Sequence, residues 1–283
     1  MRRLAAAIGA LLVSAAPAMA ADAPAGLVSD PCVGRVPVPP ALLAAMAARY
    51  DTKRTAPPPA VPPEELAAYR KAQAEAQTRD WPNLCLYRAD NAALAAGPAA
   101  GRQVVFMGDS ITQGWGLADA PFFAGGWVNR GISGQTTPQM LARFQADVVA
   151  LKPRAVHIMA GTNDVAGNTG PTSAQDIQNN VVAMVTLAKA NRVAVVLASI
   201  PPAKVFLWAP ALKPADQIRG LNDWLKAYAA KEGLIYVDYY AAMATTDGAM
   251  KPELTFDGVH PNAAGYAVME PLARQALKRA LAR

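Results

Sequence analysis

The sequence predicts an α/β protein built on a parallel, doubly wound sheet, and two observations support this prediction. From Arg102 onward, short β-branched or apolar runs alternate with longer stretches of helical pattern. These short runs are apolar on both faces, as strands are when they lie between two layers of helices. Alternation of strands and helices of this kind is typical of a parallel sheet covered on both sides.

The elements of this sheet can be assigned in chain order. Five runs are predicted to be strands: Val104–Met107, Trp127–Asn129, Ala155–Met159, Ala194–Ser199 and Leu234–Val237. Four segments are predicted to be helices: Pro138–Leu151, Ala174–Lys189, Gln217–Lys231 and Ala263–Leu281. Ligands of such sheets bind beyond the carboxyl ends of the strands, so chemistry is expected there.

The residues before this pattern are predicted to form two different segments. Residues 1–20 resemble a signal peptide, with Arg2 and Arg3, an apolar stretch and the small-x-small site Ala18-Met19-Ala20. A retained N-terminal anchor is the alternative. Residues 21–100 read as a Pro- and Ala-rich, partly helical extension, and residues 101–283 as the main domain. Within the extension, helices are expected over Ala41–Tyr50 and Glu64–Arg79, and Trp81–Leu86 is a candidate to contact the main domain.

Charge and cysteine content indicate which kinds of partner the protein can bind and in which cellular compartment it is expected. Removal of residues 1–20 lowers the net charge from +6 to +4, and the basic residues are scattered, which disfavours nucleic-acid binding. No later run is long and apolar enough to span a membrane. Cys32 and Cys85, the only cysteines, are expected to form a disulfide in an exported protein, periplasmic or extracellular, and make a poor metal site. The oligomeric state is left open.

Four polar, glycine-containing blocks lie where this topology predicts chemistry. Three follow strands: Gly108-Asp109-Ser110-Ile111-Thr112, Gly131-Ile132-Ser133-Gly134 and Gly161-Thr162-Asn163-Asp164. The fourth, Asp257-Gly258-Val259-His260-Pro261, precedes the last helix. Each block alone is a weak signal, because such residues also form turns and helix caps. Their joint occurrence at the ends of elements predicts one shared site.

Histidine is the scarce residue type in this site, because the chain contains only His157 and His260. A serine nucleophile needs an imidazole base within hydrogen-bond reach, and a carboxylate holds that imidazole in one tautomer. His157 lies inside a predicted strand, where a core histidine is the ordinary explanation. His260 lies in a loop with Asp257 three residues earlier. Ser110, His260 and Asp257 are therefore the candidate nucleophile, base and orienting acid.

The four blocks together resemble those of the SGNH, or GDSL-like, hydrolase family over about residues 102–283. The resemblance implies a three-layer, flavodoxin-like αβα fold with five parallel strands, and no metal or organic cofactor. It also implies an oxyanion hole formed by the Ser110 N–H, the Gly134 N–H and the Asn163 side chain, with Asp109 as a structural brace. The sequence departs from the family name only at Ile111, which stands in place of leucine.

The expected activity is hydrolysis of carboxylic esters on a small-molecule or carbohydrate substrate. The stretches that begin at Ile200, Asp238 and Asn262 resemble acetylhydrolase-like members and carbohydrate esterases, which favours a short acyl group, acetyl above all. Four aromatic residues are candidates for substrate contact, with core or lid packing as the alternative: Trp115, Trp127, Phe206 and Trp208.

Other activities compatible with the same residues stay open. A lysophospholipase or thioesterase would use the same triad with a longer acyl pocket, and an acyltransferase would replace water by a sugar hydroxyl. A non-catalytic carbohydrate-binding protein on this fold is the alternative from another class. Retention of Ser110, Asp257, His260, Gly134 and Asn163 together argues against it.

Overall fold

The structure is a computed structural model that describes residues 26–33, 35–53 and 55–282. By its contacts the chain divides between residues 34 and 35, and the part from Arg35 onward is one compact unit. In the first part, the described residues include a turn in which the Cys32 N–H donates to the Asp30 carboxylate (2.9 Å). The expected signal peptide, residues 1–20, lies outside the described residues. The expected division at residue 100 remains a prediction, and residues 35–100 are described here with the rest of their unit.

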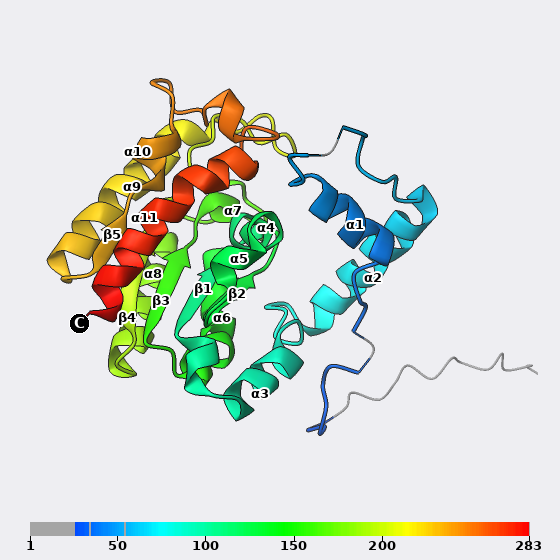
Figure 1. The fold of residues 1–283 in the computed structure, drawn as a ribbon, viewed down its shortest axis with the longest axis horizontal. Coiled ribbons are helices and arrows are strands. Elements are labelled where there is room, and N and C mark those ends of the chain that lie inside the picture. Colours follow the sequence, from blue (N-terminus) through cyan, green and yellow to red (C-terminus); the bar gives the residue numbers. More distant parts are fainter. Residues whose placement is uncertain (1–25, 34, 54, 283) are drawn as a thin grey trace, which may run out of the picture. The chain divides into compact units, whose positions relative to one another are not determined.

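The centre of this unit is a sheet of five parallel strands in the order β2-β1-β3-β4-β5 (Figure 1). The strands are β1 (Val104–Gly108), β2 (Trp127–Gly131), β3 (Ala155–Met159), β4 (Ala194–Ala198) and β5 (Ile235–Val237). All four neighbouring pairs are parallel, as the strand–helix alternation predicts. The predicted five-stranded α/β fold is confirmed.

Helices cover both faces of the sheet, which completes the predicted three layers (Figure 1). One face packs against α6 (Thr137–Asp147), α8 (Ala174–Ala190) and α9 (Pro214–Lys231). The other packs against α4 (Ser110–Ala118), α5 (Ala120–Phe123), α10 (Tyr239–Met243) and α11 (Ala263–Leu281). In β1, Val105 and Met107 join the first core, whereas Val104 and Phe106 join the second, because successive strand side chains point to opposite faces.

The remaining elements are shorter or lie before the sheet. They are α1 (Pro40–Ala48), α2 (Pro63–Arg79), α3 (Arg88–Ala96), α7 (Thr162–Val165) and the 3₁₀ helices η1 (Ala99–Arg102), η2 (Val149–Leu151) and η3 (Pro252–Leu254). Among the described residues, no helix has both the length and the apolar character needed to cross a membrane.

Two nine-residue helices, α3 and α4, and the shorter α5, α7 and α10 are not predicted from the sequence, and one predicted helix is interrupted. Helix α4 contains Gly114 and Gly116, which weaken a helical signal, and α3 has only nine residues without a side-chain N-cap. The predicted helix Pro138–Leu151 is interrupted at Val148, where φ and ψ are −123° and −67°, so that α6 ends at Asp147. Boundaries of the other predicted helices differ by at most a few residues.

The strand register brings the first three polar blocks to one edge. Gly108 at the end of β1 pairs with Gly131 of β2 on one side and with Met159 of β3 on the other. The segments after these strands therefore leave the sheet at the same level. This edge lies where the strand order reverses around β1 and β3, the usual binding position in doubly wound sheets.

Candidate active site

Ser110, His260 and Asp257 form a continuous hydrogen-bonded chain, although 150 residues separate the serine from the histidine. Ser110 Oγ lies 3.0 Å from His260 Nε2, and His260 Nδ1 lies 2.8 Å from Asp257 Oδ2. The side chains of His260 and Asp257 are each 29% exposed, so the chain of contacts is open to solvent on one side. The three candidate residues from the sequence are thus brought together.

Ser110 is held at the first turn of α4, directly after β1. Asp109 caps this helix by accepting the Ile111 N–H at 2.9 Å. Burial raises the pKa of Asp109 to about 6, and its carboxylate accepts hydrogen bonds from Ile111 and Asn163 rather than from His260. A side chain at Gly108 would place its Cβ 2.0 Å from Thr112 Oγ1, so glycine lets the helix start immediately after the strand. This packing agrees with a bracing role for Asp109.

His260 and Asp257 are held by a tight loop before α11. Thr255 and Pro261 form an isolated bridge, and Thr255 Oγ1 donates to the His260 carbonyl at 2.8 Å. Asp257 Oδ1 accepts the backbone N–H groups of Val259 (3.0 Å) and His260 (2.8 Å). Burial raises the pKa of Asp257, but the hydrogen bonds from His260 outweigh it and hold the pKa at about 2. Asp257 is therefore ionised at neutral pH and can orient the imidazole.

The candidate oxyanion donors lie on the loops after β1, β2 and β3. Gly134 has φ +78°, a left-handed conformation that side-chain-bearing residues rarely adopt. Its N–H and that of Ser110 have no hydrogen-bond acceptor among the residues that the structure describes. The Asn163 amide is more occupied than expected, because its Nδ2 donates to the Gln135 carbonyl (3.0 Å) and to Asp109 Oδ2 (3.3 Å). To bind an oxyanion, Asn163 must exchange one of these bonds.

Asn168 joins these donors and was not singled out from the sequence. Its Nδ2 donates to Asn163 Oδ1 (2.8 Å) and to the Gly134 carbonyl (3.2 Å), and its Oδ1 accepts the Trp208 indole N–H (3.3 Å). In the sequence it stands between Gly167 and Gly170, a setting that indicates only a turn. The contact between loops distant in sequence gave no local signal.

Of the four candidate aromatic residues, only Trp208 lies at this site. Its ring centre is 6.1 Å from that of His260, and 46% of the residue is exposed. Phe206 is fully buried and stacks beneath Trp208 at 5.1 Å, so it supports the indole from the core side. Trp208 therefore remains the candidate for substrate contact.

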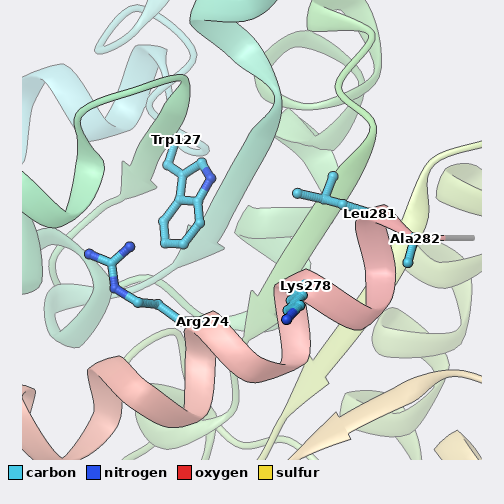
Figure 2. A pocket seen from close by; sticks show the side chains of 5 residues that line it. All are labelled: Trp127, Arg274, Lys278, Leu281 and Ala282. Atoms are coloured by element: carbon cyan, nitrogen blue, oxygen red, sulfur yellow. The ribbon is translucent and has the colours of Figure 1, made fainter.

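The expectation of substrate contact is wrong for Trp115 and Trp127. Trp115 is fully buried, and its ring stacks 4.6 Å from Phe122, because α4 turns this side chain into the core. Trp127 is the first residue of β2, whereas the candidate site lies beyond the other end of that strand. It lines a separate pocket of about 400 Å³ with α11 residues, including Arg274 and Lys278 (Figure 2).

His157 is a core residue of β3, as predicted. It is fully buried, and its Nε2 lies 2.9 Å from the Tyr239 hydroxyl. Burial lowers the pKa of His157 to about 3, so that the ring is neutral at physiological pH. This position leaves His260 as the histidine in contact with Ser110.

The cysteines and the acidic residues complete the inventory of reactive groups. Cys32 and Cys85 are both disulfide-bonded. Within the described ranges, no group of three or more His, Cys, Asp or Glu side chains is placed to hold a metal ion.

Chemically, the site offers a hydroxyl beside an imidazole, with a carboxylate on the other ring nitrogen. This arrangement can activate a hydroxyl for attack on an acyl carbon.

Comparisons with known proteins point to the same chemistry. A family model described as the GDSL-like lipase/acylhydrolase family matches residues 106–268. The acetylxylan esterase of Geobacillus stearothermophilus is 31% identical over 153 residues, which are 50% of this chain and 67% of that protein. The uncharacterised lipoprotein YqeF of Bacillus subtilis is 43% identical over 79 residues, and the match spans 22% of this chain and 32% of YqeF.

A solved structure extends the likeness over most of the sheet-containing unit. A GDSL-like lipase from Bacteroides thetaiotaomicron shares 44% sequence identity with this chain at a TM-score of 0.68. The superposition covers 71% of this chain and 99% of that structure.

Proposed function

This chain belongs to the GDSL-like lipase/acylhydrolase family and is a serine ester hydrolase, and we propose that Ser110, His260 and Asp257 form its catalytic triad. The observation that carries this proposal is the pair of contacts from His260, at 3.0 Å to Ser110 Oγ and at 2.8 Å to Asp257 Oδ2. Both lie within the distances at which a base and its orienting acid act.

In the proposed mechanism, Ser110 Oγ attacks the carbonyl carbon of the ester while His260 Nε2 accepts the hydroxyl proton. The ionised Asp257 stabilises the resulting imidazolium through Nδ1. His260 then returns the proton to the leaving alkoxide, which departs as an alcohol and leaves an acyl group on Ser110. Water, deprotonated by His260, attacks this acyl-enzyme and releases the carboxylic acid and the free serine.

The negative oxygen of each tetrahedral intermediate is assigned to the N–H groups of Ser110 and Gly134 and to the Asn163 amide. Two of these donors have no other acceptor among the described residues, which supports their availability. The Asn163 amide gives up its longer hydrogen bond, the one to Asp109 at 3.3 Å, and donates that N–H to the oxyanion instead. Each oxyanion donor contributes about 3 to 4 kcal/mol to catalysis in serine hydrolases.

The substrate class that we propose is a short acyl ester, above all an acetyl ester, of a carbohydrate or small alcohol. Likeness to an acetylxylan esterase supports this class. Trp208 also supports it, because an indole beside His260 restricts the space on that side and provides a flat apolar face.

A hydrolase for longer acyl chains, such as a lysophospholipase or thioesterase, is the second candidate. Exposed apolar side chains favour it: Val205 and Leu207, within three residues of Trp208 in the chain, are 44% and 68% exposed, and Phe256 beside Asp257 is 44% exposed. Such a rim would bind an acyl chain that extends beyond the site.

Hydrolysis of p-nitrophenyl acetate, butyrate and octanoate distinguishes these candidates. We expect kcat/KM to be highest for acetate and to fall with chain length, and we expect Ser110→Ala to abolish turnover of all three esters. Highest activity on octanoate would favour the second candidate. Equal rates in the wild type and Ser110→Ala would contradict the proposed triad.

Export is proposed from three observations together. Residues 1–20 have the pattern of a signal peptide, Cys32 and Cys85 are disulfide-bonded, and one relative is a lipoprotein. Disulfides persist chiefly in oxidising compartments. We therefore place the protein in the periplasm or outside the cell, where acylated carbohydrates are accessible to it.

A further inference from the structure

We propose that residues 81–91, here called the strap, are a working part of the active site, and that Tyr87 is a positioning residue for the oxyanion donors. This inference rests on the proposed function. The strap precedes residue 106, where the match to the family begins, so the family match assigns it no role. Its contacts reach the loop that carries Gly134.

This loop, residues 131–135, is called the oxyanion loop. The Ile132 N–H donates to the Gly108 carbonyl at 3.1 Å, which ties the loop to the end of β1 just before Ser110. At its far end, the Gln135 carbonyl accepts the Asn163 amide at 3.0 Å. The loop therefore carries one proposed oxyanion donor, Gly134, and orients another, Asn163.

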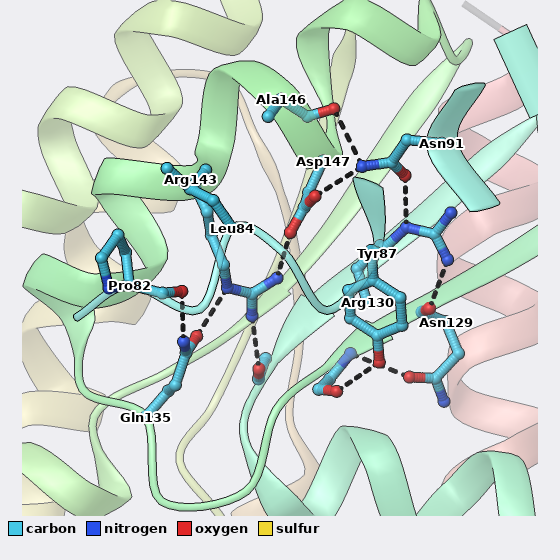
Figure 3. A network of polar contacts seen from close by, with 12 residues as sticks. Pro82, Leu84, Tyr87, Asn91, Asn129, Arg130, Gln135, Arg143, Ala146 and Asp147 are labelled. Atoms are coloured by element: carbon cyan, nitrogen blue, oxygen red, sulfur yellow. Dashed lines mark hydrogen bonds and ion pairs between the residues drawn. The ribbon is translucent and has the colours of Figure 1, made fainter. Parts of the chain in front are cut away.

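The strap holds this loop at both ends (Figure 3). The Tyr87 hydroxyl donates to the Gly131 carbonyl at 2.6 Å, and the Pro82 carbonyl accepts the Gln135 side-chain amide at 2.8 Å. A third bond lies just beyond, where the Gln139 side chain donates to the Trp81 carbonyl at 2.9 Å. The strap thus binds the backbone of the oxyanion loop at Gly131 and its side chain at Gln135, the first and last residues of the loop.

Tyr87 is suited to a fixed donor role. Burial raises the pKa of its hydroxyl to about 12, so that the group keeps its proton at every pH at which the enzyme would work. The guanidinium of Arg130 lies over its ring at 4.5 Å and fixes the ring plane. Asp80 holds the turn before it by accepting the N–H groups of Leu84 and Cys85, both at 2.8 Å.

Arg143 connects the same contacts to the nucleophile. Its side chain is fully buried and donates to Gln135 Oε1 (2.5 Å), to the Gly108 carbonyl (3.0 Å) and to Asp147 (2.8 Å), as Figure 3 shows. The Gln135 amide thus bridges the strap and Arg143. A displacement of the strap would move the Gly134 N–H relative to Ser110, and such donors act only when they are placed to within about 0.5 Å.

Tyr87→Phe tests the inference, because it removes the hydroxyl and keeps the ring under Arg130. We expect kcat for p-nitrophenyl acetate, per active site titrated with a fluorophosphonate, to fall about tenfold with KM nearly unchanged. Affinity for phenylboronic acid, which forms a tetrahedral adduct with a serine hydroxyl, should fall by a similar factor. The pH profile should keep its shape, because the His260–Asp257 pair is untouched.

Tyr69→Phe is the matched control. Tyr69 lies in α2 of the same extension, and among the described residues its hydroxyl bonds only to Gln73, from which it accepts at 2.6 Å. We expect its kinetic constants to equal those of the wild type. Should Tyr87→Phe fail to fold, Gln135→Glu removes the donor to Pro82 and keeps the acceptor for Arg143, and the same loss in kcat and in boronate affinity is expected.

The outcomes separate the two proposals. An active wild type whose Tyr87→Phe variant keeps kcat and boronate affinity within twofold would overturn the role of the strap and leave the triad intact. A wild type as inactive as Ser110→Ala on every ester would overturn the proposed function itself. A parallel loss of kcat and boronate affinity in Tyr87→Phe, absent from Tyr69→Phe, supports the strap as part of the active site.

Discussion

At the scale of single residues, Asn168 shows how a polar side chain far from the nucleophile in sequence can organise the proposed site. Its amide nitrogen bonds to both Asn163 and the Gly134 peptide, and its oxygen bonds to Trp208. Two proposed oxyanion donors and the Trp208 indole therefore share one partner. Because Asn168 is solvent-exposed, these bonds contribute more to the placement of the donors than to the stability of the fold.

Asn168→Asp would replace the donating amide by a second acceptor and leave the bond to Trp208 possible. We expect kcat on p-nitrophenyl acetate to fall about tenfold, equivalent to about 1.4 kcal/mol of transition-state stabilisation, with little change in Tm. Asn179→Asp on α8 is the control, since Asn179 is exposed and its side chain, within the described ranges, only accepts a bond from Gln175. Equal kcat in the two variants would exclude a positioning role for Asn168.

The sequence is informative about residues whose role shows in local spacing. Asp257 and His260 lie three positions apart, and Ser110 follows a strand directly, so all three could be predicted. Tyr87, Gln135 and Asn168 act through contacts with segments distant in the chain, and nothing near them in sequence indicates those partners. Trp115 and Trp127 mislead for the complementary reason, because closeness to the nucleophile in sequence does not place a side chain at the site. Trp115 turns into the core, and Trp127 lies at the other end of β2.

At the scale of elements, the segment 201–213 between β4 and α9 contains no helix or strand and brings Trp208 to His260. Phe206, fully buried, holds the segment to the core through its stacking contact with Trp208. The length and apolar content of residues 201–213 favour a functional loop, but the sequence does not indicate which side chain it presents, because that depends on packing. Its role is best tested by selectivity for acyl length.

Trp208→Ala should widen the site next to His260. We expect the ratio of kcat/KM for p-nitrophenyl octanoate to that for acetate to rise about fivefold, because the space filled by the indole becomes available to the acyl chain. Trp208→Phe keeps an aromatic ring and loses only the N–H that bonds to Asn168. It should retain the wild-type ratio. An unchanged ratio in Trp208→Ala would place the acyl chain elsewhere.

At the scale of the whole molecule, two buried groups, Asp109 at the start of α4 and His157 in β3, shift stability with pH in opposite directions. Asp109 has its pKa raised to about 6, so its contribution to stability is largest below its ordinary value of 3.8 and is lost as the pH rises through about 6. His157 has its pKa lowered to about 3 from an ordinary value of 6.5. Between these two values His157 is protonated in the unfolded chain and neutral in the folded chain. The free energy of unfolding therefore falls as the pH drops below about 6.5.

His157→Gln should remove the part of the stability loss at acid pH that His157 causes. From pH 7 to pH 5 the histidine lowers the free energy of unfolding by roughly 2 kcal/mol, and the variant lacks that decrease. Urea unfolding of the wild type and of the variant at pH 7 and pH 5 measures the change in the free energy of unfolding for each protein. The absolute stability of the variant at pH 7 is expected to be lower, since Gln fits the buried position next to Tyr239 less well. Parallel pH dependence in the two proteins would show that His157 does not titrate as its burial requires.

The buried Arg143–Asp147 pair has a consequence for how this sequence can drift or be redesigned. Buried ion pairs seldom stabilise a protein as much as well-packed apolar residues of similar volume. Selection for thermal resistance alone would thus tend to replace Arg143 and its partners by a hydrocarbon cluster. The resulting protein would be more thermostable, but it would lose the Arg143 side chain that donates to both the Gly108 carbonyl and Gln135. Screens that measure only whether a variant stays folded after heating would then enrich variants that fold but catalyse slowly.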